Sequence, residues 1–298
     1  MPLKSLNINL KPLIKKLEIS LKRGYTQDAV TSTFRSVFRG RGLEFDRFRV
    51  YSPSDDAREI DWKASLKAQD LLVRVLTEER NIDVMFLMEV GNSMIFASGE
   101  KLKCEYAAEL VATLSFGMIE AGNKVGLVMF TDRVVKHIVG NTGMAHFYRL
   151  TKTLSDPALY TGDFDMDMIM RYSTRIFKNG TIVFIISDFI GLSEGWRTNL
   201  EIMAKKFDVI GVMVRDRRDN SLEGASGQFV LGNPYTGDDL LVDVELVKKK
   251  YAQFAELQIK EIENVFKHVG ADFIMLETDL DFVHPIVKLL NMRKQRWR

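Results

Sequence analysis

The chain has 298 residues, of which 46% are hydrophobic and 28% are charged, and its net charge is +2. This is the ordinary composition of a globular protein with a sizeable core, and the length fits one large domain or a large domain with an appendage. The single cysteine, Cys104, excludes an intrachain disulfide and a cysteine-rich zinc site. A net charge so close to zero favours neither an acidic nor a basic partner.

The distribution of apolar residues bears on the location of the protein. No apolar run approaches the roughly 18–20 residues that a membrane-spanning helix needs. Lysines and glutamates interrupt residues 1–23 every few positions, so we expect neither a signal peptide nor a spanning segment. We therefore expect a cytoplasmic protein. The basic ends of the chain, 1–50 and 291–298, leave peripheral contact with an anionic membrane surface open.

The N-terminal segment begins with a predicted helix. Apolar residues at helical spacing predict this helix over 12–22, with Gly24 as its stop. Residues 25–42 are polar and Arg-rich, and Phe34 and Phe38 lie four residues apart. A basic stretch with aromatic side chains can bind single-stranded nucleic acid through charge and stacking. Phenylalanines at this spacing more often pack within a protein, so nucleic-acid binding is kept as an alternative and is not expected.

Residues 44–51 alternate in a way that predicts a twisted strand, and an unusually acidic segment follows. Within 54–62, three aspartates, a glutamate and an arginine stand next to a tryptophan. Opposite charges at this density predict a half-buried ion-pair network that fixes the N-terminal piece onto the main sheet. The predicted members of this network are Arg47, Asp55, Asp56, Arg58, Asp61 and Trp62.

Three apolar runs, 83–89, 124–130 and 181–186, predict strands that are buried on both faces of a parallel sheet. Because the carboxyl ends of parallel neighbours meet at one edge of a sheet, we expect the polar side chains after them to share one crevice. A single aspartate after a strand usually starts a turn or caps a helix, but three coincident clusters favour a site for a hard cation such as Mg²⁺. These side chains are Glu89 and Ser93, Thr131 and Asp132, and Ser187 and Asp188.

The rest of the pattern predicts further strands separated by helices. We expect an α/β protein with a doubly wound, mostly parallel Rossmann-like sheet and an N-terminal helix and β extension. Residues 1–80 would form the N-terminal part and 81–298 the main domain. The predicted helices are 101–120, 165–177, 245–269 and 282–290, and the predicted strands are 134–139, 207–214 and 272–276, with a hairpin over 228–231 and 240–244.

Several motifs resemble those of one family. The segment 38–45, with Arg47 and Tyr51, and the run Asp-Asp-Ala-Arg-Glu-Ile-Asp-Trp at 55–62 resemble the signature of the domain-of-unknown-function 58 family. Members contain a von Willebrand factor A-like domain and accompany MoxR-type AAA+ ATPases. The resemblance runs from about residue 15 onward and implies a Rossmann-like sheet, a metal-ion-dependent adhesion site in many members, and roles in protein assembly rather than catalysis. Further matches are Val73-Arg74, 78–80, 131–133, 187–189 and 276–279.

The adhesion site of the family normally opens with Asp-x-Ser-x-Ser, and these positions are here Glu89, Gly91 and Ser93. Glutamate adds one methylene and Gly91 removes a hydroxyl ligand, so we expect a weakened or altered site. The threonine ligand of the family falls in the loop 161–165, where its register stays open. The expected ion is Mg²⁺, with Mn²⁺ or Ca²⁺ as substitutes. The resemblance therefore implies a metal site built from Glu89, Ser93, Asp188 and the candidates Thr161 and Asp163.

These features together predict a non-enzymatic protein-binding module. The resemblance implies that a MoxR-type ATPase is a partner in assembling or activating other complexes, and the acidic side chain of a partner protein would complete the shell of the metal. The chain has no nucleophile elbow, P-loop or dinucleotide fingerprint. The alternative from another class is a Mg²⁺-dependent phosphoesterase or nuclease. It lacks a convincing base, because His137, several residues on, is the nearest histidine to a strand-end loop.

Overall fold

The computed structural model describes residues 5–10, 12, 15, 43–53, 55–78, 82–232 and 239–296. The Arg-rich stretch 25–42 and most of the predicted helix over 12–22 lie outside these residues. What the sequence predicts for those two segments therefore stays a prediction.

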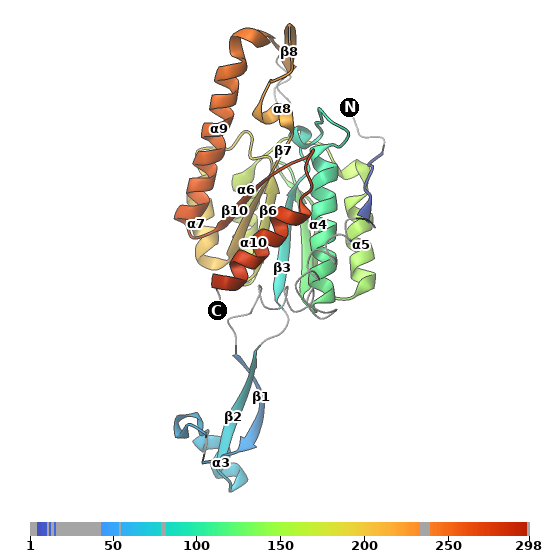
Figure 1. Cartoon of the computed structure of the whole chain (residues 1–298). Coiled ribbons are helices and arrows are strands. Elements are labelled where there is room, and N and C mark those ends of the chain that lie inside the picture. The colour runs from blue at the N-terminus through green and yellow to red at the C-terminus, as the bar shows by residue number, and fades with distance from the viewer. Residues whose placement is uncertain are drawn as a thin grey trace.

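Within the described residues, a six-stranded sheet lies at the centre of the molecule, with the strand order β10-β7-β6-β3-β4-β5 (Figure 1). Neighbouring strands pair in parallel except for β4 and β5, which pair antiparallel. The chain is thus a mixed α/β protein with a mostly parallel central sheet, as the apolar runs predict. The strands are β3 (Asp83–Glu89), β4 (Lys124–Phe130), β5 (Val134–Asn141), β6 (Ile182–Ser187), β7 (Asp208–Arg215) and β10 (Asp272–Glu277).

The three predicted buried strands are neighbours in this sheet. β3 lies between β4 and β6 and pairs in parallel with both. In all three strands the residues from the second position onward are buried, since both faces of the sheet are covered. The polar residues that follow these strands therefore emerge at the same edge of the sheet.

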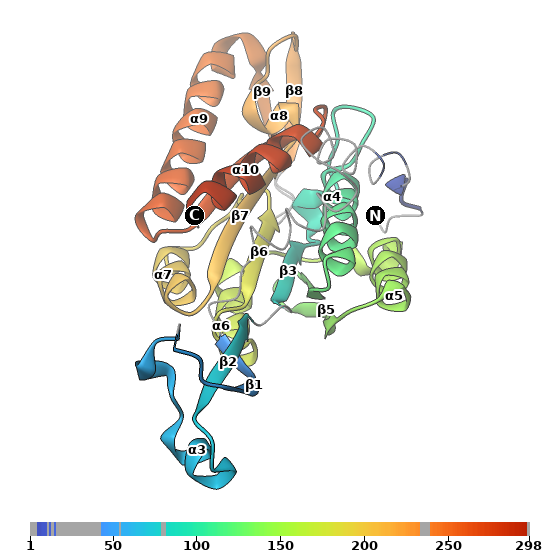
Figure 2. The ribbon, with the colours of Figure 1, turned by 60° about the horizontal axis from the view of Figure 1, so that its bottom comes forward.

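Helices cover both faces of the sheet (Figures 1 and 2). Val84, Phe86 and Met88 of β3 belong to the core cluster that α4, α5 and α10 complete. Met85 and Leu87 belong to the cluster that α6, α7 and α9 complete, as expected from the two-residue period of a strand. None of the helices in the described residues has the length and the apolar composition needed to cross a bilayer. The long helices are α4 (Lys103–Glu120), α5 (Met144–Leu154), α6 (Met166–Ile176), α7 (Trp196–Lys206), α9 (Val244–His268) and α10 (Val283–Arg296).

Most predicted elements of the main domain are confirmed. The predicted helices over 101–120, 165–177 and 245–269 are α4, α6 and α9, while the closing helix is longer than predicted and reaches Arg296. The predicted hairpin consists of β8 (Gln228–Gly232) and β9 (Asp239–Asp243), which pair antiparallel. Helix α5 was not predicted. The remaining short helices are η1 (Ala57–Glu59), α3 (Trp62–Ala68), η2 (Asn92–Met94), η3 (Pro157–Leu159) and α8 (Arg217–Asn220).

The predicted strand over 44–51 is β1 (Leu43–Val50), and it pairs antiparallel with β2 (Leu72–Glu78), which was not predicted. The polar residues between these two strands organise their own connection. Asp56 accepts a hydrogen bond from the backbone N–H of Arg58 and caps η1, while the indole of Trp62 is 64% exposed.

Two ion pairs hold this connection to the hairpin. Arg49 lies 2.8 Å from Asp55. Asp61 caps the N-terminus of α3 and pairs with Arg74 of β2 at 2.5 Å. These pairs join β1 and β2 to the segment between them, which is a different role from the predicted anchoring onto the central sheet. The partner of Asp61, Arg74, was not among the predicted members of the network.

Candidate functional site

A cluster of buried charged residues lies where β3, β6 and β7 end. Glu89 is the last residue of β3, Asp188 directly follows β6, and Arg215 is the last residue of β7. All three are almost completely buried. The strands are parallel and in register, so their ends deliver these groups to one edge of the sheet. Lys103, the first residue of α4, reaches the same edge from one face.

Glu89 is held by two serine hydroxyls. Its Oε1 accepts a hydrogen bond from Ser93 Oγ at 2.8 Å, and its Oε2 accepts one from Ser187 Oγ at 2.5 Å. Burial and, secondly, the negative charge of Asp188 raise the pKa of Glu89 to about 8, although the two hydroxyls and Lys103 act in the opposite direction. At neutral pH the side chain of Glu89 is therefore mostly a neutral acid.

Lys103 and Arg215 are the two positively charged residues of the cluster, and Lys103 contacts its carboxylates directly. Its Nζ lies 2.8 Å from Asp188 Oδ2 and 2.8 Å from Asp219 Oδ2, and its side chain is 1% exposed. Burial by itself would lower the pKa of Lys103, but the two carboxylates outweigh burial and the pKa is raised. Lys103 is thus a buried ammonium ion with two carboxylate partners, which is the arrangement that makes a buried charge tolerable. The ring of Phe96 lies 5.7 Å from the same nitrogen.

A further buried charge, Asp216, and the cluster residue Arg215 connect this cluster to neighbouring segments. Asp216 accepts hydrogen bonds from the backbone N–H and the hydroxyl of Ser98, which fastens the loop before α4 to the end of β7. Arg215 donates to Gln258 of α9 at 2.9 Å, and burial lowers its pKa. Its Nε has no hydrogen-bond partner among the described residues. The cluster therefore fixes the position of α9 as well as that of α4.

The loop that contains Thr161 and Asp163 approaches the site through its backbone. The N–H of Asn92 donates to Gly162 O at 2.9 Å, and the side-chain oxygen of Asn92 accepts from Gly162 N at 3.2 Å. Thr161 and Asp163 are exposed, so the choice between them as the loop ligand stays open. In the predicted pair Thr131 and Asp132, the hydroxyl of buried Thr131 donates to exposed Asp132, and the carbonyl of Thr131 accepts from the N–H of Asp165 in the same loop.

The structure thus brings Glu89, Ser93 and Asp188 together, as the sequence predicts. It adds Lys103 and Asp219, which the sequence pattern did not single out. One signal was available for Lys103: it lies four residues before Ala107 and seven before Leu110, on the face of α4 that packs into the core. A lysine in such a stripe is buried or reaches past the core to a partner.

These residues do not fit Mg²⁺ as they lie. An ion of this kind needs oxygen ligands at about 2.1 Å in near-octahedral geometry, whereas Asp188 already holds the ammonium of Lys103 and Glu89 holds two hydroxyls. At an effective dielectric constant of about 20, a divalent ion about 4 Å from an ammonium would face roughly 8 kcal/mol of repulsion. Within the described ranges, no group of three or more His, Cys, Asp or Glu is arranged to hold a metal.

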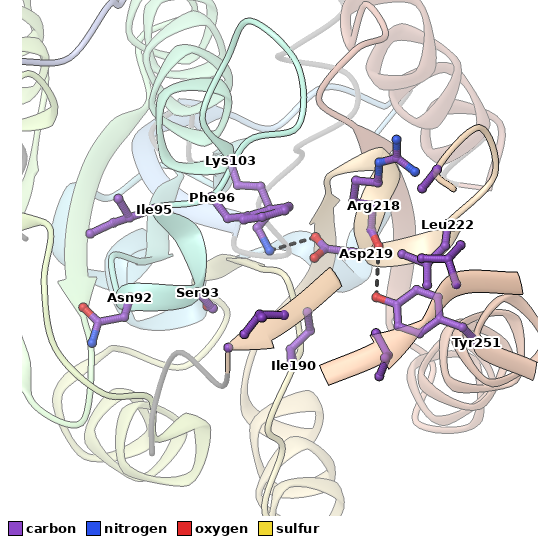
Figure 3. A pocket seen from close by; sticks show the side chains of 15 residues that line it. Asn92, Ser93, Ile95, Phe96, Lys103, Ile190, Arg218, Asp219, Leu222 and Tyr251 are labelled. Atoms are coloured by element: carbon purple, nitrogen blue, oxygen red, sulfur yellow. Dashed lines mark hydrogen bonds and ion pairs between the residues drawn. The ribbon is translucent and has the colours of Figure 1, made fainter. Parts of the chain in front are cut away.

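A cavity of about 530 Å³ opens beside this cluster (Figure 3). Lys103, Asp219 and Ser93 lie on its inner side. Apolar side chains from the 95–96 loop, the β8–β9 hairpin and the start of α9 form most of the remaining wall, and the hydroxyl of Tyr251 donates to the carbonyl of Arg218 at 2.9 Å. The cavity is therefore mainly apolar with one fixed charged pair, which is typical of a binding pocket. The apolar lining residues include Ile95, Phe96, Leu222, Val230, Val242 and Val244.

The fold and this cluster define a mixed α/β protein with a polar site and a pocket at the carboxyl ends of a mostly parallel sheet. The chain belongs to the family described as protein of unknown function DUF58, whose model matches residues 47–261. The family resemblance that the motifs predict is thereby confirmed. An uncharacterized protein of Mycobacterium bovis is 24% identical over 294 residues, covering 96% of this chain and 90% of the relative.

Solved structures resemble the fold. The conserved hypothetical protein BatB from Bacteroides thetaiotaomicron is 14% identical, with a TM-score of 0.50 over 72% of this chain and 100% of that chain. A von Willebrand factor type A protein from Catenulispora acidiphila is 15% identical, with a TM-score of 0.33 over 48% of this chain and 35% of that chain. At 14% identity the likeness to BatB concerns the fold alone.

Proposed function

We propose that the chain is a non-enzymatic protein-binding module, an adaptor or co-chaperone that works with a MoxR-type AAA+ ATPase in assembling or activating other complexes. The main observation behind this proposal is the apolar cavity at the carboxyl edge of the sheet, with a charged pair held in its wall. The choice of partner rests on the family resemblance. We place the activity in the cytoplasm, since such an ATPase needs ATP, and peripheral contact with a membrane stays an expectation.

A doubly wound, von Willebrand factor A-like arrangement of the main domain is part of this proposal. Two observations support it: β3 lies between β4 and β6 in parallel pairing, and helices cover both faces of the sheet. In doubly wound sheets, ligands bind outside the carboxyl ends of the strands, which is where the cavity lies.

The contacts of the polar groups favour binding over catalysis. The hydroxyls of Ser93 and Ser187 both donate to Glu89, and the ammonium of Lys103 is held by two carboxylates. A nucleophilic serine needs a general base beside it, and a carboxyl group that keeps its proton at neutral pH, as Glu89 does, cannot take the proton of a hydroxyl. The histidines do not supply such a base either, since His137 contacts Tyr172 and His146 contacts the carbonyl of Val125. His268 ends α9, and His284 lies 3.8 Å from Asp281.

The cavity suits an apolar side chain of a partner protein. Val230 of β8 lines it and is 60% exposed, so a side chain inserted there would cover surface that water now reaches. Full burial of one leucine or phenylalanine side chain contributes about 1.5–3 kcal/mol. An acidic side chain of the partner was predicted as the ligand of a bound metal. Lys103 lies where that metal would bind. The apolar wall of the cavity is therefore a better basis for binding the partner protein.

The test compares two valine variants. Val230→Lys places a charge in the cavity wall, and Val139→Lys is the matched control, because Val139 is 69% exposed on β5 and lies outside the cavity. Calorimetric titration with the purified MoxR-type ATPase of the same organism, with ATP or ADP present, measures the affinity. We expect Val230→Lys to weaken binding at least ten-fold and Val139→Lys to leave it unchanged.

Two results would contradict the proposal. Equal affinities of the two variants would exclude the cavity as the binding surface. Turnover of a phosphodiester in the presence of Mg²⁺, abolished in Asp188→Ala, would replace the binding module by the hydrolase that the sequence leaves as an alternative.

A further inference from the structure

We propose that the ammonium of Lys103 is the built-in cation of this site and takes the place of the divalent ion that the adhesion-site motif predicts. The site is then complete without a metal. This inference concerns the ion alone, so it does not depend on which partner the module binds.

The first observation is what Lys103 connects. Its Nζ joins Asp188, which follows β6, to Asp219 in α8, at 2.8 Å from each carboxylate. These two aspartates come from different segments of the chain, and both contact this nitrogen. A divalent ion at the end of a parallel sheet has the same role, because it draws oxygen ligands from several loops to one point. Here a side chain of the protein itself supplies the positive charge.

The position of Lys103 in its helix supports this role. Lys103 is the first residue of α4, and the N-terminus of a helix carries partial positive charge, so a buried cation is unfavourable there. The helix itself therefore gives no reason for the lysine. The two carboxylates do, because their charges and hydrogen bonds outweigh the unfavourable effect of burial. The ammonium of Lys103 also lies over the ring of Phe96, 5.7 Å from its centroid, which is a cation–π contact.

The glycine at the missing serine position is a second, independent observation. A Cβ built on Gly91 would lie 3.2 Å from the carbonyl oxygen of Asp163 and 3.4 Å from Glu89 Oε1 and from Gly162 O. The space next to a ligand serine is thus taken up by the backbone of the 161–163 loop. The hydroxyl that a metal would use at this position is missing, and a side chain here would require the neighbouring backbone to shift by a few tenths of an ångström.

The experiment is a titration of metal ions against three proteins in a chelator-stripped buffer. The wild type, Lys103→Met and the control Lys101→Met are titrated with Mg²⁺ and Mn²⁺ by calorimetry, and thermal unfolding is followed with and without the ions. Lys101 is a suitable control because it lies two residues away and pairs with Glu109, outside the cluster. We expect no saturable binding of Mg²⁺ or Mn²⁺ by the wild type or by Lys101→Met up to millimolar ion. We expect Lys103→Met to bind Mn²⁺ at least ten-fold more tightly than these two proteins.

Several outcomes would overturn the inference. Saturable binding of Mg²⁺ or Mn²⁺ by the wild type that is lost in Asp188→Asn would show that the lysine and the metal coexist. A folded Lys103→Met protein with no more affinity than Lys101→Met would show that the lysine does not occupy the place of an ion. If Lys103→Met does not fold alone, Mn²⁺ is added during refolding. Recovery of the fold by Mn²⁺ supports the inference, and no recovery at millimolar Mn²⁺ contradicts it. Partner binding is measured separately, so failure here leaves the proposed function standing.

Discussion

The replacement of Glu89 by glutamine gives the sharpest test of the buried cluster. Glu89 is completely buried and accepts hydrogen bonds from Ser93 and Ser187. Burial, followed by the charge of Asp188, raises its pKa from an ordinary value of 4.5 to about 8. Between these two pH values the side chain of Glu89 therefore keeps its proton in the folded protein, whereas in the unfolded chain it releases the proton. Glutamine has the same shape and does not titrate.

The size and sign of the effect follow from proton linkage. Between about pH 5 and about pH 8 the folded state binds up to one proton more than the unfolded state, so stability falls as the pH rises. One proton corresponds to a slope of at most about 1.4 kcal/mol per pH unit. Glu89→Gln removes this slope. The amide also carries one more hydrogen-bond donor than the neutral acid, and leaving this buried N–H without a partner costs about 1 kcal/mol at every pH.

The assay is urea unfolding of both proteins at several pH values from 5 to 8, in buffer with EDTA. The difference in free energy of unfolding is plotted against pH, which cancels groups common to both proteins, such as His137 with its pKa lowered by burial. We expect Glu89→Gln to be the less stable protein near pH 5 and to gain on the wild type as the pH rises. A difference that stays constant over this range would refute the assignment of a raised pKa to Glu89.

Two further predictions concern glycines whose missing side chains the structure explains. Gly91→Ser restores the motif serine. We expect lower thermal stability, because its Cβ would lie 3.2 Å from Asp163 O, and no gain in Mn²⁺ affinity, because Lys103 is still present. Saturable Mn²⁺ binding in calorimetry would contradict this prediction. Gly211→Ala puts a Cβ 2.5 Å from a ring carbon of Phe266, so we expect a loss of about 1–3 kcal/mol in urea unfolding. Phe266→Leu should reduce that loss in the double variant, and strictly additive losses would show that the two positions do not contact each other.

The sequence determined the central strands and the edge at which the site lies. The runs 83–89, 124–130 and 181–186 have no charged or polar residue apart from their end positions, and such strands need a layer of helices on each face of the sheet. The polar residues that follow them then have to meet at one edge. The turn-rich segment with alternating runs between β7 and α9 likewise predicted the β8–β9 hairpin, because its pattern has the period of a strand.

Local patterns failed where an element depends on distant partners. β2 was not predicted, although Val73 is buried, because its pairing with β1 spans the long acidic connection. Helix α5 was not predicted either. Apolar and polar residues are mixed along it, and the buried positions His146, Phe147, Leu150 and Leu154 become recognisable as one face only once they pack against the sheet.

The chemistry of the site was decided by the tertiary structure alone. A lysine at a helix start is ordinarily exposed, and its sequence neighbours do not show which carboxylates will surround it. Asp188 and Asp219 lie 85 and 116 residues from Lys103. Whether the edge of the sheet holds a metal ion or an ammonium group depends on the contacts of Lys103 with these two aspartates. The physical reason is that a buried charge is stable only with its partners in place, and the fold brings those partners from three separate segments.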